Sequence, residues 1–556
     1  MQLLLSILLL VESFPLHQVH LTESRWRDNL ERDSVWVCSI TSQQALHNFR
    51  NTAGVYSARE GGYDAFTKMG GWESPDCDLR GHIVGHLLSA YALLYASTGE
   101  EIFRLKGDSI VQGLRQCQRV IGTGYISAFP QELIYRNLRG EAVWAPWYTL
   151  HKLMKGLRDE VNLCHNDTAQ LILNDFTQWA LSTLPKDEAI RQRAIRNEFG
   201  GIAEAIPELY DFFYHNEKLD PLYAGNMNMG TMHCNTFLPK VIVECQHSNE
   251  GRVMALRFFH EMVEKHCFVT GSISDKEHFF DPKQMSSHLS GYTGESCCTY
   301  NMLRLAKALY PYYPNDPLIM DYYERALVNH ILGQQDPKTG MLHYFLPMQT
   351  GAYKLYSTQM QSFWCCVGSG FESQANYADA IYWHNQQNST NRDTIYVNLF
   401  IPSVLDWQEK GVVLRQETSF PNGQSSTLII DKAPAKSLTI MVRQPQWTGK
   451  TGYKAYTRKW KQGDKISLTL PMHEHYVYTP DSAYVAIMNG PIVLAGQLGE
   501  VEQPFSDPTK HNDYYTYDYN VPDDLKTIRL SQKSDIKTQP IYETHHQRYV
   551  IYWKNE

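Results

Sequence analysis

The spacing of apolar residues divides the chain into two parts with different periods. Between about residues 40 and 385, apolar residues recur mostly three and four positions apart, as they do in amphipathic helices. The clearest such segments are residues 80–97, 101–117, 148–163, 169–184, 250–267, 297–310 and 317–332. Loops rich in glycine and proline separate them, so about ten to twelve helices are expected.

This number of helices suits a closed ring of helical hairpins, an (α/α)6 barrel, whose loops gather around a central cavity at one end. An open helical solenoid is the alternative. No repeat of fixed length is visible along the sequence. The lack of a repeat favours the barrel.

After about residue 391 the period changes to two. Apolar and polar residues alternate over residues 394–400, 438–443, 466–470 and 484–488, with turn sequences PNG at 421–423 and NGP at 489–491. Such alternation is typical of half-buried strands and predicts a β-sandwich. The polar segment 502–522 is expected to be a wrapping loop, and residues 548–553 a terminal strand that returns to the sandwich.

The expected fold class is therefore α+β multidomain, with an (α/α)6 barrel catalytic domain over residues 13–390 and a β-sandwich domain over residues 391–556. Residues 1–12 contain an apolar run that resembles the core of a signal peptide, although a positively charged leader and a clean cleavage site are missing. The chain is accordingly expected to be secreted. No later stretch is long and apolar enough to span a membrane.

Composition narrows the choice of partner. The formal net charge is -8, which leaves no basic surface for a nucleic acid, and a neutral substrate such as carbohydrate fits better. The 35 tyrosines and 12 tryptophans are typical of carbohydrate clefts, and also of large aromatic cores. With 11 cysteines, an odd number, at least one stays outside any intramolecular disulfide. The oligomeric state does not follow from these features.

Two cysteine pairs carry the strongest chemical signal. They lie in FWCC at residues 363–366 and in ESCC at 295–298. Thiolates are strong zinc ligands, and a site built from three sulfurs and one carboxylate would suit tetrahedral zinc. The candidate ligands are Glu295, Cys297, Cys365 and Cys366. Four protein ligands usually mark a structural zinc, so the cysteines alone leave open whether the site is structural or catalytic.

Other polar residues accompany these cysteines. Glu277 lies in a loop between two predicted helices and is expected to act as a proton donor rather than as a metal ligand. His82 and His86 are four residues apart, so they share one helical face and could bind a metal, although packing or substrate contact fits better without an adjacent glutamate. His151 alone is more typical of a buried core histidine, and Cys298 of a small buried apolar residue.

Several motifs together resemble the β-L-arabinofuranosidases of glycoside hydrolase families 127 and 146. The motifs are WAPWYTLHK at residues 144–152, HCNT at 233–236, EHF at 277–279, ESC at 295–297, FWCC at 363–366 and GFE at 370–372. The resemblance runs in order from about residue 14 to residue 553. It implies an (α/α)6 barrel, β-sandwich modules and release of β-linked L-arabinofuranose from plant cell-wall glycans or glycoproteins.

The resemblance also implies roles for individual residues. Zinc is bound by Glu295, Cys297, Cys365 and Cys366, with Cys365 as the nucleophile of a retaining mechanism and Glu277 as the acid/base residue. The residues implied to contact the sugar are His151, His233, Trp144 and Glu372. Because side chains diverge between neighbours in an extended segment, Cys365 and Cys366 are expected to present different faces to the cavity.

Two features depart from the family pattern: Cys234 stands where alanine is more usual, and the amino terminus is shortened. Two further interpretations stay open. The same fold and chemistry may serve another furanose or an acidic sugar, because loops at the barrel mouth set specificity. Alternatively, the chain is a catalytically silent carbohydrate-binding protein with a structural zinc.

Overall fold

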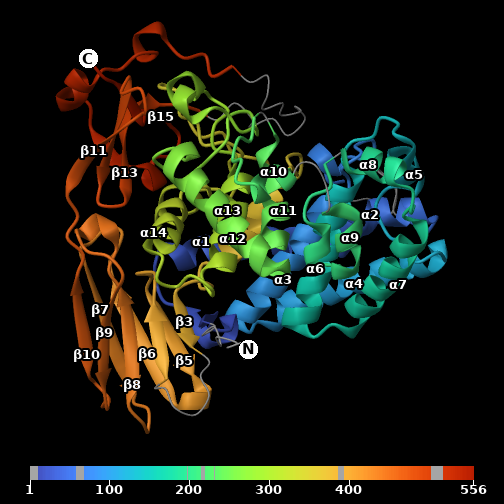
Figure 1. Cartoon of the computed structure of the whole chain (residues 1–556), viewed down its shortest axis with the longest axis horizontal. Helices are drawn as coiled ribbons and strands as arrows, with labels where there is room; N and C mark the ends of the chain where they lie inside the picture. The colour runs from blue at the N-terminus through green and yellow to red at the C-terminus, as the bar shows by residue number, and fades with distance from the viewer. Residues whose placement is uncertain are drawn as a thin grey trace, which may run out of the picture.

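A computed structural model describes residues 11–57, 68–196, 198–214, 219–230, 232–385, 393–502 and 518–556. A helical domain fills the first two thirds of the chain, and β-sheets follow it (Figure 1). The expected class, an α/α barrel followed by a β-sandwich, is confirmed. Residues 1–10, which hold the apolar run on which secretion was predicted, lie outside the described residues, and secretion stays a prediction.

The seven expected helical segments are present as α3, α4, α6, α7, α12, α13 and α14, and the described residues contain fifteen α-helices in all, more than the ten to twelve expected. They are α1 (Arg25–Ser39), α2 (Ser42–Ala53), α3 (His82–Thr98), α4 (Glu101–Ile121), α5 (Glu132–Arg139), α6 (Pro146–Cys164), α7 (Asp167–Thr183), α8 (Glu188–Arg196), α9 (Tyr210–Phe213), α10 (Asp220–Tyr223), α11 (Cys234–His247), α12 (Asn249–Glu261), α13 (Ser296–Leu309), α14 (Pro317–Ala326) and α15 (Cys365–Ala375). No helix in the described part of the chain is both long and apolar enough to cross a membrane.

Five helices form the interior of this domain and position the site. Each contacts the next in the order α6, α3, α15, α13 and α11. The crossing of α3 and α6 is close because both contribute a glycine. A Cβ atom on Gly85 would lie 2.1 Å from the carbonyl oxygen of Lys152, and one on Gly156 would lie 2.2 Å from that of Gly85. Larger residues at these two positions would push the helices apart.

The strands form three sheets rather than one sandwich. They are β1 (Val11–Ser13), β2 (Val19–Leu21), β3 (Tyr382–Asn385), β4 (Thr394–Val397), β5 (Ser403–Trp407), β6 (Val412–Thr418), β7 (Ser425–Lys432), β8 (Leu438–Arg443), β9 (Tyr453–Arg458), β10 (Lys465–Thr469), β11 (Glu474–Tyr478), β12 (Tyr484–Asn489), β13 (Ile492–Glu500), β14 (Thr538–Pro540), β15 (Gln547–Val550) and β16 (Tyr552–Lys554).

Two five-stranded sheets, β1-β3-β4-β8-β9 and β10-β7-β6-β5-β2, make the expected sandwich. All neighbours pair antiparallel except β4 and β8, which pair in parallel with Ile395 opposite Ile440. Buried residues of both sheets belong to one hydrophobic core. The first two strands, β1 and β2, come from the amino-terminal end of the chain and pair with β3 and β5, so the predicted boundaries at residues 12 and 390 cut across hydrogen-bonded strands.

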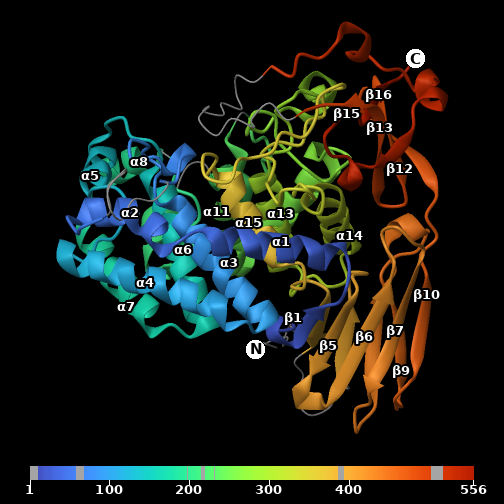
Figure 2. The same ribbon diagram turned by 180° about the vertical axis from the view of Figure 1, so that it is seen from behind.

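The predicted terminal strand is present as β15 and β16, and it returns to β12, one of the strands expected in the sandwich, but in a separate sheet. The strands β15 and β16 pair with β13 and β12 in a third sheet that also contains β11 and β14. This sheet lies beside the helical domain (Figure 2), where the Tyr552 hydroxyl accepts a hydrogen bond from the Val269 N–H at 2.8 Å. Of the predicted wrapping loop, residues 503–517 lie outside the described residues.

Candidate active site

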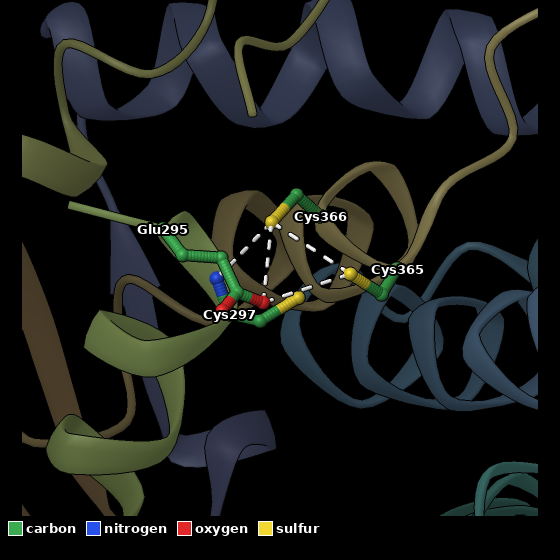
Figure 3. Close-up of side chains that lie close together, drawn as sticks. All are labelled: Glu295, Cys297, Cys365 and Cys366. Carbon is green, nitrogen blue, oxygen red and sulfur yellow. Dashed lines mark hydrogen bonds between the residues drawn. The ribbon is translucent and has the colours of Figure 1, made fainter. Parts of the chain in front are cut away.

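The four predicted metal ligands meet at the N-terminal ends of two interior helices. Glu295 is the N-cap of α13 and Cys297 lies in its first turn, while Cys365 and Cys366 are the first two residues of α15. Their ligand atoms all lie within 4.8 Å of one another. The Oε1 atom of Glu295 is 3.7 Å from the Cys365 Sγ and 3.9 Å from the Cys366 Sγ, and the two sulfurs are 3.9 Å apart (Figure 3).

These separations fit a tetrahedral metal ion. With metal–sulfur distances of about 2.3 Å, the corners of a tetrahedron are about 3.8 Å apart. Three sulfurs and one carboxylate oxygen form a donor set that suits zinc better than magnesium or calcium, which prefer oxygen ligands. The cluster could therefore hold one metal ion in its present geometry.

The electrostatics of the cluster also favour a cation. Burial, followed by the neighbouring Cys365 and Glu277, raises the pKa of Glu295 well above its usual value. Burial likewise raises the pKa of the Cys365 and Cys366 thiols. Burial acts in the same direction on Cys297, but hydrogen bonds from Cys365 and Cys366 outweigh it and lower that pKa to about 7. Four acidic groups packed this closely ionise together only beside positive charge.

The two helix N-termini supply part of that positive charge. The backbone N–H of Cys297 points at the Cys366 Sγ, 3.4 Å away. Anionic groups are stabilised at this end of a helix because its backbone N–H groups lack helical partners and the macrodipole is positive there. The position of Cys365 and Cys366 in a helical turn also corrects the expectation of an extended segment: both side chains face the cluster from the first turn of α15.

Residues around the ligands hold them in place. The Ser369 hydroxyl lies 3.1 Å from the Cys297 Sγ, and the Cys298 thiol donates to the second oxygen of Glu295 at 3.0 Å. Cys298 is thus buried, as predicted, but it also orients a ligand. Cys234, the departure from the family pattern, lies beside Cys298 and exchanges a hydrogen bond with it. Such contacts set the geometry of metal ligands.

Glu277 lies in a strained loop beside the cluster. Its φ angle is 68°, and those of Ser274 and Lys276 are also positive, a conformation that side chains other than glycine rarely adopt. Neighbouring backbone holds the loop, because the Glu277 carbonyl accepts from the Cys234 N–H at 2.8 Å and the Phe279 N–H donates to the Met232 carbonyl at 3.0 Å. Strain of this kind gathers at functional sites.

The carboxyl group of Glu277 is linked to the cluster through one tyrosine. The Tyr344 hydroxyl donates to the Glu277 Oε1 and lies 3.3 Å from the Cys365 Sγ. Because one hydroxyl contacts both groups, they lie within two hydrogen-bond lengths, about 6 Å, of each other. Tyr344 belongs to no motif in the sequence, and only the tertiary structure identifies it.

His233 contacts the other oxygen of Glu277. It caps α11, and its Nε2 lies 3.3 Å from the Glu277 Oε2. Burial lowers the pKa of His233, but the carboxylates of Glu277 and Glu198 outweigh burial and raise it. The predicted sugar contact thus lies next to the predicted acid/base residue. His233, Glu277 and Glu295 also form a second group of ligand atoms within 4.8 Å of one another.

Two other predicted sugar contacts are buried and bonded to other side chains. His151 is fully buried: its Nδ1 accepts from the Gly201 N–H at 3.1 Å, and its Nε2 lies 2.5 Å from the Glu204 Oε1. Glu372 bonds the His86 Nδ1 at 2.5 Å and accepts from the Tyr300 hydroxyl. These side chains already have protein partners, and their contact with sugar stays a prediction.

Trp144 lies on the rim of the site. It is 46% exposed, and its ring meets the ring of Trp72 edge to face at 5.3 Å. Trp72 in turn lies 6.3 Å from the ring of Tyr344. Sequence reasoning missed Trp72, which lies in the short 3-10 turn Gly71–Glu73, outside every motif. These two indoles form an aromatic wall leading to Tyr344 and Cys365, and the sugar contact of Trp144 stays a prediction.

The histidine pair on α3 is held by carboxylates. The Nδ1 atom of His82 lies 2.9 Å from the Leu79 carbonyl oxygen and 2.9 Å from the Glu73 Oε1, while His86 bonds Glu372. Neither histidine belongs to a cluster of three ligating side chains within the described residues. The interpretation of this pair as packing or substrate contact therefore fits the structure better than metal binding.

Two family models match the chain. A family model described as the catalytic domain of GH127 β-L-arabinofuranosidase matches residues 18–379, and one described as the middle domain of the same family matches residues 394–453. The first match alone covers more than half of the chain. A search of curated proteins finds no match.

Solved structures show the same fold. The GH127 β-L-arabinofuranosidase of Geobacillus stearothermophilus T6 aligns with a TM-score of 0.70 at 14% identity, over 97% of this chain and all of the other. A GH127 β-arabinofuranosidase aligns with a TM-score of 0.68 at 14% identity, over 98% of each chain. A third structure, a glycoside hydrolase, gives 0.67 at 14% identity, over 99% of this chain and 98% of the other.

Proposed function

The chain belongs to the GH127 β-L-arabinofuranosidase family of glycoside hydrolases, and on that premise we propose that it is a retaining, zinc-containing enzyme. Its proposed reaction releases β-linked L-arabinofuranose from plant cell-wall glycans or glycoproteins. The observation that carries this proposal is the contact of one hydroxyl, that of Tyr344, with both Glu277 and the Cys365 sulfur. Retaining glycosidases place nucleophile and acid/base residue about 5–5.5 Å apart, and the shared hydroxyl keeps these two side chains within about 6 Å of each other.

In the first half of the proposed reaction, the Cys365 sulfur attacks the anomeric carbon. The bond from this carbon to the leaving oxygen breaks as the carbon–sulfur bond forms, and Glu277 gives its proton to that oxygen. Glu277 then carries the negative charge that Cys365 has lost. His233, 3.3 Å from Glu277, is placed to stabilise this carboxylate.

In the second half, Glu277 acts as the base. It takes a proton from water, the water oxygen attacks the anomeric carbon, and the carbon–sulfur bond breaks to regenerate the Cys365 thiolate. Two inversions at the same carbon give retention of configuration. Tyr344 has one proton to donate. While Glu277 is protonated, the hydroxyl can donate to the Cys365 sulfur, and after proton transfer it can donate to the Glu277 carboxylate.

The proposed metal would be held by Glu295, Cys297, Cys365 and Cys366. Zinc bound to a thiol removes its proton, so it would supply Cys365 as a thiolate at neutral pH although burial raises the pKa of that thiol. Glu295, Cys297 and Cys366 would still bind the metal while the Cys365 sulfur forms its bond to the anomeric carbon. Ser369 and Cys298 fix two of these ligands from behind.

A panel of aryl glycosides, with the released sugar identified, tests the proposal. Hydrolysis of the aryl β-L-arabinofuranoside with release of β-L-arabinofuranose in the first turnover supports it. Preferential hydrolysis of another furanoside or of an acidic sugar would keep the chemistry and change the substrate. Absence of hydrolysis on the whole panel, with zinc bound, would instead support a carbohydrate-binding protein with a structural zinc.

A further inference from the structure

A second set of metal-binding side chains adjoins the cysteine cluster. His233, Glu277 and Glu295 each place one ligand atom within 4.8 Å of the others. They come from three separate segments, because His233 precedes α11, Glu277 lies in the strained loop and Glu295 precedes α13. Among the described residues, this set and the cysteine cluster are the two groups in which three or more ligating side chains converge. The proposed reaction uses these three residues without a metal between them.

The contact between His233 and Glu277 has the length of one edge of a zinc coordination shell. The Nε2 atom of His233 lies 3.3 Å from the Oε2 atom of Glu277. With zinc–nitrogen and zinc–oxygen distances of about 2.0–2.2 Å, the corners of a tetrahedron lie about 3.3–3.6 Å apart. The other separations are at most 4.8 Å, so the Glu295 carboxylate would approach by about 1.5 Å or less to complete the site.

Neighbouring hydroxyl groups orient these ligands, as is usual around metal ions. The Tyr344 hydroxyl donates to the Oε1 of Glu277, which turns Oε2 toward His233. The Nδ1 of His233 lies 3.3 Å from the Thr236 hydroxyl oxygen, which can accept a proton from Nδ1 when Nε2 binds a metal. Glu295 is fully buried, whereas the His233 side chain is 18% exposed. A cation would therefore reach the site from the side of His233.

The charge of the cysteine cluster favours a second cation beside it. Three thiolates and one carboxylate carry four negative charges, twice the charge of the one zinc ion that they would hold. The Glu277 carboxylate adds a fifth negative charge next to Glu295. A cation between Glu277 and Glu295 is attracted by all of these charges, and the attraction is strong because burial excludes water.

We propose that His233, Glu277 and Glu295 bind a second zinc ion when zinc is in excess, and that this ion inhibits the enzyme. Because a carboxylate has two oxygens, Glu295 can bind both ions, which two-metal sites hold about 3.5–4 Å apart. Binding releases the Glu277 proton to solvent, so Glu277 can no longer protonate the leaving oxygen. The site itself rests on the ligand geometry, whereas the inhibition rests on the proposed function.

Equilibrium dialysis of the enzyme loaded with one zinc per chain tests the site directly. As the free zinc concentration rises, elemental analysis should find a second step of binding, from one zinc per chain to two. Glu277→Gln and His233→Gln should keep the first zinc and shift the second step to at least about tenfold higher free zinc, since each removes a ligand. If one variant loses the first zinc as well, the other decides.

His278→Gln is the matched control. This histidine is exposed, and its ring centre lies 5.3 Å from that of His233, but it does not belong to the ligand group. The variant should keep the second step at the wild-type zinc concentration. A shift as large as that of His233→Gln would contradict the assigned ligands.

Inhibition provides the second arm. In the wild type, kcat/KM for an aryl β-L-arabinofuranoside should fall about tenfold when free zinc is ten times the dissociation constant of the second step, and chelation of the excess should restore it. The same concentration of Mg²⁺ should not inhibit, because imidazole suits zinc and Mg²⁺ prefers oxygen ligands.

The outcomes separate this inference from the proposed function. One zinc per chain throughout the dialysis, or a second step that is unchanged in both ligand variants, would overturn the second site and leave the enzyme an arabinofuranosidase. A second step without loss of activity would overturn the inhibition. If no glycoside of the aryl panel is hydrolysed, the proposed function and the inhibition fail together, and the dialysis still decides whether the second site exists.

Discussion

Replacing Tyr344 by phenylalanine removes one oxygen atom from the centre of the proposed mechanism. The lost hydroxyl donates to Glu277 and lies 3.3 Å from the Cys365 Sγ. The ring itself is retained, so its contacts with Trp364 and Trp72 are preserved. The variant therefore keeps the shape of the site while the proton donor shared by nucleophile and acid/base residue is gone.

The magnitude follows from the charge of the groups that Tyr344 contacts. A hydrogen bond to a charged group contributes about 1.5–3 kcal/mol. Whichever of Glu277 and Cys365 is ionised in a given step receives this bond, so the loss falls on the transition state of both halves of the reaction. Since about 1.4 kcal/mol corresponds to a factor of ten in rate, kcat/KM should fall by about 10- to 100-fold.

The assay is kcat/KM for aryl β-L-arabinofuranosides with zinc content and thermal unfolding measured in parallel. Tyr322→Phe is the matched control: its hydroxyl is equally buried but donates to the Gly271 carbonyl at 3.0 Å rather than to Glu277 or a proposed metal ligand. It should leave kcat/KM within twofold of the wild type. If Tyr344→Phe does no more than this control, the shared hydroxyl has no part in catalysis.

Three further predictions concern the acid, the metal and pH. Glu277→Gln should abolish turnover of substrates with poor leaving groups and impair activated ones less, and an equal loss on both in steady-state assays would argue against its role as the acid. Cys366→Ser should lose metal and stability together, whereas Cys365→Ser should keep the fold and some zinc but lose turnover. Elemental analysis and calorimetry distinguish the two variants. Full metal content in Cys366→Ser would contradict the role of Cys366 as a ligand. Burial lowers the pKa of His86 and His151 to about 4. Because an unfolded histidine has a pKa of about 6.5, the free energy of unfolding should be highest above pH 6.5. It should decline toward pH 4 by up to about 1.4 kcal/mol per pH unit for each of the two histidines. Urea unfolding between pH 7 and 4.5 measures the decline, and a flat profile would be inconsistent with buried neutral histidines.

Local periodicity was sufficient for the elements that carry a long amphipathic pattern. The segments expected at residues 101–117 and 438–443 became α4 and β8 with few changes at their ends. The strands β1 and β2 were missed because each has three residues, and their partners lie at least 370 positions away along the chain. Pairing at such distance depends on the assembled core, which a local pattern does not contain.

The same limit applies to the site. The cysteines and Glu295 could be grouped from chemistry, because thiolates and carboxylates are metal ligands wherever the fold brings them together. The helical start at Cys365 was missed, since α15 is rich in small residues and its close contact with α3 requires glycine at position 368, where a Cβ would lie 2.3 Å from His86. Tyr344 could not be found, because its role arises only from contacts with Glu277 and Cys365.

The most direct test of the account is to identify the residue that becomes bonded to the sugar. A haloacetyl or epoxide mimic of L-arabinofuranose should inactivate the zinc-loaded enzyme, and peptide mass spectrometry should find one adduct per chain, on Cys365. Because Cys365, Cys366 and Cys297 lie within 4.8 Å of one another, only the mapped site distinguishes the attacking sulfur from its neighbours. An adduct on Cys366, Cys297 or a glutamate, or hydrolysis that persists in Cys365→Ala, would contradict catalysis by Cys365.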